Sequence, residues 1–378
     1  MPYYTLRKSL VAATVLLAAG RATGYDELDI LAGQHVVYSF PSSSQPPDEL
    51  MRLTRAGLVG GVILFGVNVD ANTSQSMSAL KHAYDSSPAP ALLKKKTGKD
   101  ARFLVTTDQE GGQVRRIKDG EPKLSAKQIG ASADPAAAGE AAGAGAADSL
   151  LRYQCNSNLA PVLDVFRQPG DFTDYYGRSF GNTSRQVVRA AVPFITAQQG
   201  RGVSACAKHF PGLGAASHDA NTDEEPVVLN LTLSEMRAVD EAPYEAAIAA
   251  GVGMVMASWA VYPALDRRPA GLSAKWIKGE LRGRLGFKGV TITDALEAGS
   301  LAAYGDAGAR GTAAAAAGMD ILLASGKNVT QGEAVRTALV QALRRCELDR
   351  AEFDAATGRI AAVRSRIAAQ GACVTWQR

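Results

Sequence analysis

The chain has 378 residues, of which 46% are hydrophobic and 21% charged, and its formal net charge is +4. This length and apolar content permit a large buried core, in one big domain or two modest ones, and exclude a mostly disordered chain. The basic residues are spread out except for a run at 94–99, which we interpret as a solvated loop. We therefore expect no nucleic-acid partner.

Residues 1–24 have the layout of a secretory signal peptide. Two basic residues precede an apolar run over 10–19, and small residues follow it. The run is too short to span a bilayer, no second run approaches that length, and no cysteine follows it that could carry a lipid. We expect a secreted, extracellular protein without membrane attachment, with its mature domain over 25–370 and a tail over 371–378.

Four Asn-x-Ser/Thr patterns support secretion, because they are acceptors for N-glycosylation. They begin at Asn72, Asn182, Asn230 and Asn328. Together with the signal peptide they indicate a secreted glycoprotein.

Eight short apolar runs rich in β-branched residues recur along the chain, each followed by a longer segment with helical periodicity. The runs are 35–40, 61–65, 103–107, 158–165, 203–208, 253–258, 289–293 and 319–324. Eight strand–helix units imply parallel strands joined by helical crossovers, as in a single (β/α)8 TIM barrel of the α/β class. The alternative is a doubly wound open sheet, but no Gly-x-Gly-x-x-Gly turn follows the first run.

Two helices between these runs have recognisable ends. The residues 182–184 offer N-caps for a helix that ends near Gly200. Thr232 and Glu235 form a capping box, which begins a helix that we expect to continue to Gly251.

Polar side chains gather just after the expected strands, where a barrel carries its chemistry. They include Asp108, Glu110 and Arg116 after the third run, Asp164 and Arg178 after the fourth, Lys208 and His209 after the fifth, Ser258 and Trp259 after the sixth, and Asp294 after the seventh. Such cations and carboxylates suit the hydroxyl and amide groups of a carbohydrate, with Trp259 as a flat apolar wall. Asp294 is the clearest nucleophile candidate, although a helix N-cap is an equal interpretation of the residue alone.

Three segments resemble the signature segments of glycoside hydrolase family 3, in particular its single-domain β-N-acetylglucosaminidase (β-hexosaminidase) branch. They are Thr-Asp-Gln-Glu-Gly-Gly at 107–112, Lys-His-Phe-Pro-Gly at 208–212 and Thr-Asp-Ala-Leu at 293–296. The resemblance implies retaining, exo-acting hydrolysis of terminal β-linked N-acetylglucosamine through a covalent glycosyl-enzyme on Asp294. It also implies that the sugar is bound by Asp108, Arg116, Arg178, Lys208 and His209.

The acid/base position departs from the family pattern. In the single-domain branch, the loop after Lys-His-Phe-Pro-Gly presents Asp-x-His as acid and base, and alignment places Asp219 on the aspartate but Asn221 on the histidine. Asparagine cannot shuttle a proton. The sequence favours His218, whose unperturbed pKa is about 6.5, over Asp223, a carboxyl near 4 whose pKa burial must raise. Ser258 is a second departure, because a histidine often follows the sixth strand.

Other functions stay open. The family also contains β-glucosidases, and the loss of histidine at Asn221 is compatible with a catalytically weakened carbohydrate-binding protein. Phosphate could replace water as the acceptor, and Lys208 could form a Schiff base in a lyase. We expect a monomer with no metal or organic cofactor, because the histidines lack ligand spacing.

Overall fold

The computed structural model describes residues 24–367. The predicted signal peptide, apart from Gly24, and the predicted tail lie outside this range. Eight parallel strands form one sheet in which spatial neighbours follow chain order. They are β1 (Val36–Tyr38), β2 (Gly61–Leu64), β3 (Leu104–Thr107), β6 (Ser157–Asn158), β7 (Ser204–Phe210), β8 (Met254–Ala257), β11 (Val290–Thr293) and β12 (Leu322–Leu323). A parallel bridge between Ile292 and Ile321 joins the two edges, so the sheet closes into the predicted (β/α)8 barrel.

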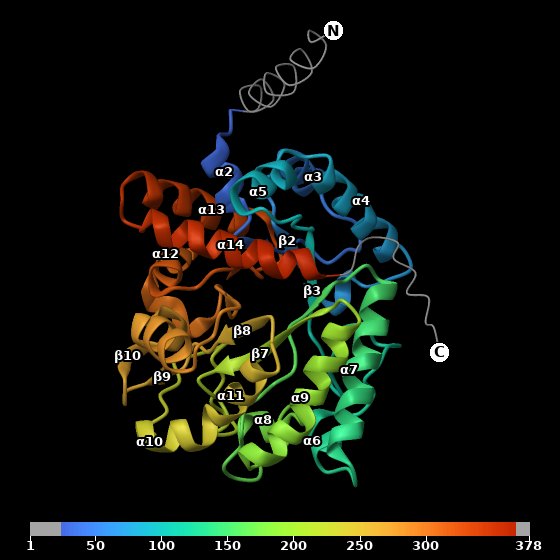
Figure 1. The fold of residues 1–378 in the computed structure, drawn as a ribbon, viewed down its shortest axis with the longest axis vertical. Helices are drawn as coiled ribbons and strands as arrows, with labels where there is room; N and C mark the ends of the chain where they lie inside the picture. The colour runs from blue at the N-terminus through green and yellow to red at the C-terminus, as the bar shows by residue number, and fades with distance from the viewer. Residues whose placement is uncertain (1–23, 368–378) are drawn as a thin grey trace, which may run out of the picture.

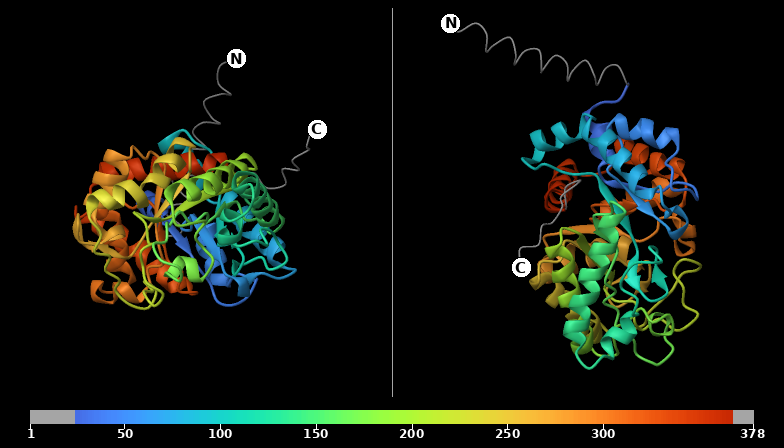
Figure 2. Two further views of the ribbon diagram at one scale, coloured as in Figure 1. Left: turned by 90° about the horizontal axis from the view of Figure 1, so that it is seen from below. Right: turned by 90° about the vertical axis from the view of Figure 1, so that its right-hand side faces the viewer.

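Helices surround this barrel, as Figures 1 and 2 show. The α-helices are α2 (Glu27–Gly33), α3 (Asp48–Arg55), α4 (Thr73–Asp85), α5 (Ala89–Thr97), α6 (Ala126–Gly130), α7 (Pro135–Arg152), α8 (Phe172–Tyr175), α9 (Ser184–Gly200), α10 (Leu233–Glu235), α11 (Ala242–Ala249), α12 (Ala307–Ala317), α13 (Val329–Arg344) and α14 (Arg350–Arg366). The 3-10 and π segments are η1 (Gly66–Asn68), η2 (Met236–Asp240), η3 (Ala270–Leu272), η4 (Lys275–Arg284) and η5 (Gly299–Tyr304). Within 24–367, no helix is both long and apolar enough to cross a membrane.

The barrel strands are buried along their whole length, which explains why each reads as a continuous apolar run. Their inward side chains form a core of their own inside the barrel. This core includes Val37, Ile63, Leu104, Leu159, Cys206, Met254, Met256, Ile292 and Leu323. The larger core lies between the strands and the helices. Packing on both faces fixes each strand, and with it the position of the polar residues at its end.

The fourth strand is much shorter than its apolar run predicts. The sequence suggested 158–165, whereas β6 covers only Ser157–Asn158. Pro161 follows and has no backbone N–H to continue the ladder. A bridge between Val162 and Lys208 then keeps the segment beside β7.

The expected helix over 232–251 is interrupted. Its capping box between Thr232 and Glu235 is present, but α10 passes into the π segment η2 before α11 begins. Pro243 cannot donate a backbone hydrogen bond, and the Glu241 N–H reaches back to the Met236 carbonyl at 2.8 Å. The other predicted helix starts as expected, with the Thr183 side chain accepting from the Gln186 N–H.

Two small hairpins at the strand ends were not predicted. They are β4 (Gln109–Gly111) with β5 (Val114–Arg115), and β9 (Val261–Tyr262) with β10 (Asp266–Pro269). In the first, Gly111 and Gly112 have φ angles of 116° and 55°. A Cβ at Gly111 would lie 2.3 Å from the Leu124 carbonyl oxygen, so only glycine fits this turn.

Helices α7 and α9 pack closely because small residues on α7 face the backbone of α9. A Cβ at Gly139 would lie 2.1 Å from the Ala190 carbonyl oxygen, and one at Gly143 would lie 2.2 Å from the Phe194 carbonyl oxygen. These contacts hold the two helices that follow β3 and β6.

We predict that Gly143→Ala lowers the free energy of unfolding by about 1–3 kcal/mol, because α7 and α9 must separate to admit the methyl group. Gly358→Ala in α14 is the matched control, since a Cβ there meets nothing within 4 Å. The control should gain roughly 0.5–1 kcal/mol from its lower unfolded-state entropy. Urea unfolding of both variants measures the difference, and equal effects would contradict the packing argument.

Candidate active site

A pocket of about 410 Å³ opens at the carboxyl ends of the barrel strands. Its polar lining comes from the ends of β3, β6, β7, β11 and β12 and the loops that follow them, and includes Asp108, Glu110, Arg116, Arg178, Lys208, His209, Asn221, Thr222, Asp223, Asp294, Glu297, Ser325 and Lys327. The structure thus brings together the predicted sugar-binding residues with two of the four predicted catalytic ones, Asp294 and Asp223.

Another cavity, of about 420 Å³, lies at the opposite end of the barrel. Its central carboxylate, Asp320, is 1% exposed and bonded by both Arg282 and Arg359. These charges satisfy one another, and the active sites of barrel enzymes lie at the other end, at the carboxyl ends of the strands. The mouth pocket is therefore the better candidate for catalysis.

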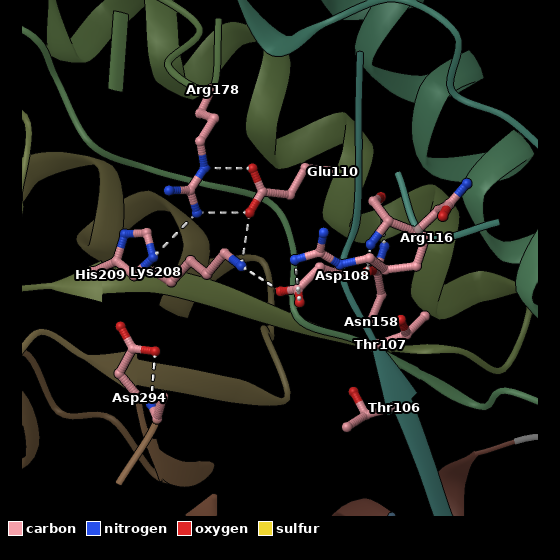
Figure 3. A network of polar contacts seen from close by, with 12 residues as sticks. Thr106, Thr107, Asp108, Glu110, Arg116, Asn158, Arg178, Lys208, His209 and Asp294 are labelled. Atoms are coloured by element: carbon pink, nitrogen blue, oxygen red, sulfur yellow. Dashed lines mark hydrogen bonds and ion pairs between the residues drawn. The ribbon is translucent and has the colours of Figure 1, made fainter. Parts of the chain in front are cut away.

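Two cations and two carboxylates form a buried network at one wall of the pocket (Figure 3). The Lys208 ammonium lies 2.9 Å from Asp108 Oδ1 and 2.8 Å from Glu110 Oε1. Arg178 donates two parallel hydrogen bonds to Glu110, at 2.9 and 2.8 Å. Each buried charge is thus compensated by an opposite one, as burial requires.

These pairs decide the protonation states. Burial alone would raise the pKa of the Glu110 carboxyl, but the charges of Arg178 and Lys208 outweigh it and hold the pKa well below its usual range. The pKa of Asp108 is also lowered, because Lys208 and Arg116 overcome the cost of burial. For Lys208, the two carboxylates outweigh burial and raise the pKa of the ammonium. All members of the network are therefore charged at neutral pH.

His209 is oriented by a buried carboxylate behind it. Its Nδ1 lies 2.8 Å from Asp164 Oδ2, and because a carboxylate only accepts, Nδ1 carries the hydrogen. The other Asp164 oxygen accepts from the backbone N–H groups of His209 and Leu213. Nε2 then points toward the pocket, 3.5 Å from the Arg178 guanidinium.

Asp294 lies at the end of β11, across the pocket from the charged network (Figure 3). Its Oδ1 accepts a hydrogen bond from the adjacent Ala295 N–H at 2.8 Å. Within the described part of the chain, Asp294 forms no ion pair, in contrast to Asp108 and Glu110. A carboxylate without a cation keeps its lone pairs available to a bound substrate.

Trp259 does not form the apolar wall that the sequence suggested. Its side chain is fully buried, and its indole N–H donates to the Ala295 carbonyl oxygen at 2.8 Å. Trp259 therefore does not line the pocket but supports the backbone beside Asp294 through this hydrogen bond. Ser258 is also buried, and its hydroxyl accepts from the Ala260 N–H.

Asp223 enters the pocket because its loop is attached to the segment after Asp294. The Gly299 N–H donates to the Asp223 carbonyl at 2.8 Å, and the Ser300 N–H donates to the Thr222 carbonyl at 3.3 Å. The Asp223 residue as a whole is exposed, although it lines the pocket. Partial burial and the neighbouring charge of Asp294 raise the pKa of Asp223 to about 6.

Asn221 forms the turn that presents Asp223. Its Oδ1 accepts from the Asp223 N–H at 3.0 Å, and its Nδ2 donates to Glu224 Oε1 at 2.9 Å. This is the local side-chain bonding that makes asparagine a frequent turn residue.

His218 and Asp219 do not line the pocket. Their side chains lie outside it on the same loop, with His218 Nδ1 2.6 Å from Asp219 Oδ1, and they are 47% and 94% exposed. The predicted catalytic residues are therefore separated into Asp294 and Asp223 inside the pocket and His218 and Asp219 beyond it.

Two structural partners of the site, Glu110 and Asp164, were seen in the sequence as strand-end residues but not counted as site residues. Charge balance was the missed signal, because Arg178 and Lys208 need a second carboxylate besides Asp108. No sequence signal identifies Asp164 as the partner of His209, since their contact depends on the path after β6.

Comparisons with known proteins agree with this geometry. Residues 28–363 match the glycosyl hydrolase family 3 N-terminal domain. A protein of Arthroderma benhamiae described as an uncharacterized secreted glycosyl hydrolase is 48% identical, covering 96% of this chain and 100% of that relative. A β-hexosaminidase of Tolumonas auensis is 33% identical, covering 73% of this chain and 78% of the relative.

Two solved structures have the same fold. A family 3 β-N-acetylglucosaminidase from Paenibacillus superposes with a TM-score of 0.81 at 28% identity, over 89% of this chain and 62% of that chain. A β-N-acetylhexosaminidase from Beutenbergia cavernae superposes with a TM-score of 0.77 at 30% identity, over 89% of this chain and 98% of that chain. This chain thus spans less than two thirds of the first structure and nearly all of the second.

We predict that Lys208→Met lowers the free energy of unfolding at pH 7 by about 3–5 kcal/mol, because two buried carboxylates lose their shared cation. In the unmodified protein, the lowered pKa values of Asp108 and Glu110 contribute stability above their ordinary values of 3.8 and 4.5, and this contribution is lost as pH falls. The deficit of the variant should therefore shrink as pH falls below about 4, which urea unfolding at pH 7 and at about pH 3 measures.

Lys95→Met is the matched control, because Lys95 pairs with Glu27 at 3.3 Å on the surface. Its effect should stay below about 1 kcal/mol at both pH values. A similar loss in the two variants would contradict a special role for the buried network.

Proposed function

Because this chain belongs to glycosyl hydrolase family 3, we propose that it removes terminal β-linked N-acetylglucosamine as a retaining exo-glycosidase. The observation that carries this proposal is the pairing of two carboxyl groups in one pocket with different environments. Asp294 forms no ion pair among the described residues, whereas burial and Asp294 raise the pKa of Asp223. Such a difference separates a nucleophile from an acid.

In the first step, a carboxylate oxygen of Asp294 attacks the anomeric carbon of the terminal sugar. The bond to the leaving oxygen breaks as Asp223 gives that oxygen its proton, which leaves a covalent glycosyl-enzyme and an ionised Asp223. In the second step, Asp223 takes a proton from water, and the water oxygen displaces Asp294 from the same carbon. Two inversions restore the β configuration and both carboxyl groups.

Asp223 is our choice for the acid/base over His218, which the sequence favoured. Asp223 lines the pocket and is fixed to the segment after Asp294, whereas His218 does not line it. A pKa of about 6 also removes the objection that a carboxyl is too acidic to hold its proton. In this proposal His218 and Asp219 contribute to substrate contacts rather than to proton transfer.

The charged network supplies the contacts to the sugar. Lys208, Arg178 and Arg116 offer N–H donors, and Asp108 offers an acceptor for hydroxyl groups. His209 Nε2 faces the same space. The pocket volume of about 410 Å³ lies near the low end for ligand pockets, which suits one terminal sugar.

We also propose that the protein is secreted and glycosylated. The relative from Arthroderma benhamiae is described as secreted. The acceptor side chains are exposed at Asn72, Asn182, Asn230 and Asn328, so an attached glycan would not disturb the core.

We predict that Asp294→Asn abolishes release of 4-nitrophenol from its β-N-acetylglucosaminide, because the amide is a poor nucleophile. Loss of kcat by at least about a thousandfold is expected, in line with removal of a covalent catalyst. Glu297→Gln is the control, since Glu297 lines the same pocket but bonds to Ser325 and Gln331. Comparable losses in both variants, or faster hydrolysis of the β-glucoside by the unmodified enzyme, would contradict the proposal.

The pH dependence tests the acid. Asp223 must be protonated when it donates, so kcat/KM should fall as pH rises through about 6. Asp223→Asn should remove this alkaline limb and slow substrates with poor leaving groups more than those with activated ones. His218→Ala should keep the alkaline limb. If His218→Ala loses this limb and Asp223→Asn keeps it, His218 and not Asp223 is the general acid.

A further inference from the structure

Aromatic side chains stand beside the pocket on the loop between β6 and α9. Phe172 and Tyr175 belong to α8, and Tyr176 follows directly. Tyr175 is 58% exposed and Tyr176 is 38% exposed. Exposed aromatic rings that gather in one place usually mark a binding surface. We call Phe172, Tyr175, Tyr176 and the adjoining His218 the aromatic platform.

The platform continues the wall of the pocket. Phe172 lines the pocket, and its ring packs edge-on against Tyr176 with centroids 5.2 Å apart. Tyr176 in turn lies 5.0 Å from Tyr175, nearly perpendicular to it. A ligand that extends out of the pocket over Phe172 therefore meets aromatic surface without a gap.

The loop that carries the proposed acid also completes the platform. The His218 ring lies 4.1 Å from the Tyr175 ring, and it is nearly parallel to Tyr176 at 6.5 Å. A backbone hydrogen bond from the Phe172 N–H to the Ala216 carbonyl, 2.9 Å long, ties α8 to this loop. The His218 Nδ1 atom also lies 2.6 Å from Oδ1 of the exposed Asp219 carboxylate.

The position of Asp223 indicates which part of a bound substrate lies next to the aromatic platform. A general acid must lie beside the leaving oxygen, and so on the leaving-group side of the bond. Asp223 and His218 are five positions apart on one loop. The leaving group thus emerges toward the part of the mouth where this loop meets α8.

We propose that the aromatic platform binds the sugar on the leaving-group side, so that the enzyme prefers β-linked oligosaccharides to glycosides with small leaving groups. This inference rests on the proposed function. A pyranose has an apolar face that packs on an aromatic ring and a rim of hydroxyls that need polar partners. Tyr175 and Tyr176 offer the rings, and His218 with Asp219 offers the polar groups.

The test compares kcat/KM for the β-1,4-linked disaccharide of N-acetylglucosamine with kcat/KM for methyl β-N-acetylglucosaminide. Tyr175→Ala and Tyr176→Ala should each lower the ratio of the two by about two- to tenfold, the effect expected for one aromatic contact. Tyr175→Phe should keep the ratio, since it keeps the ring. Val228→Ala is the matched control, because Val228 is 51% exposed but does not line the pocket.

The possible outcomes distinguish a failure of the platform inference from a failure of the proposed function. Equal losses on both substrates in Tyr175→Ala and Tyr176→Ala would mean that the rings only support the loop, and would overturn the inference. An unmodified enzyme that cleaves neither substrate would contradict the proposed function instead.

Calorimetry on Asp294→Asn tests the platform without turnover. The disaccharide should bind more tightly than N-acetylglucosamine, and adding Tyr175→Ala should remove most of that advantage. Equal affinities for the two sugars in Asp294→Asn would also overturn the inference.

Discussion

The arrangement of side chains at the mouth of the barrel depends on the buried ion pairs among Lys208, Arg178, Asp108 and Glu110. None of these four groups is stable alone in a space with so little water, because an unpaired buried ion costs several kcal/mol. Together they hold their positions without any ligand, since each charged group already has an oppositely charged partner. The sugar then meets donors and acceptors whose geometry is fixed before it binds, so little order has to be created on binding.

Asp294 shows the opposite arrangement, and the contrast explains the proposed division of roles. It shares the pocket with the network but has no cation of its own among the described residues. The rigid end of β11 and the bond from Trp259 to the Ala295 carbonyl limit its movement. Because no cation within residues 24–367 neutralises the Asp294 carboxylate, its charge can act on two neighbouring groups. One is the substrate, and the other is Asp223, whose pKa it raises.

The sequence predicted the barrel well because its signals are local and repeated. A buried parallel strand must be apolar, and eight such runs with helices between them permit few other folds. Asp294, Lys208 and His209 were likewise predictable, because strand ends converge in a barrel. Asp164, Trp259 and the break at Pro243 were not. The first two act through contacts between distant loops, and the third through hydrogen bonding that a periodic pattern does not contain.

The replacement of the expected histidine by Asn221 need not remove the acid, because proton transfer depends on position and environment more than on one residue type. Asn221 bonds to the Asp223 N–H and so turns the loop, while Gly299 and Ser300 hold Asp223 beside Asp294. The same loop places His218 against Tyr175 instead of in the pocket. In the proposed mechanism, Asp223 therefore transfers the proton in place of the histidine expected at position 221. His218 lies on the leaving-group side and takes no part in proton transfer. The carboxyl can serve because partial burial and the charge of the nucleophile together raise its pKa to about 6.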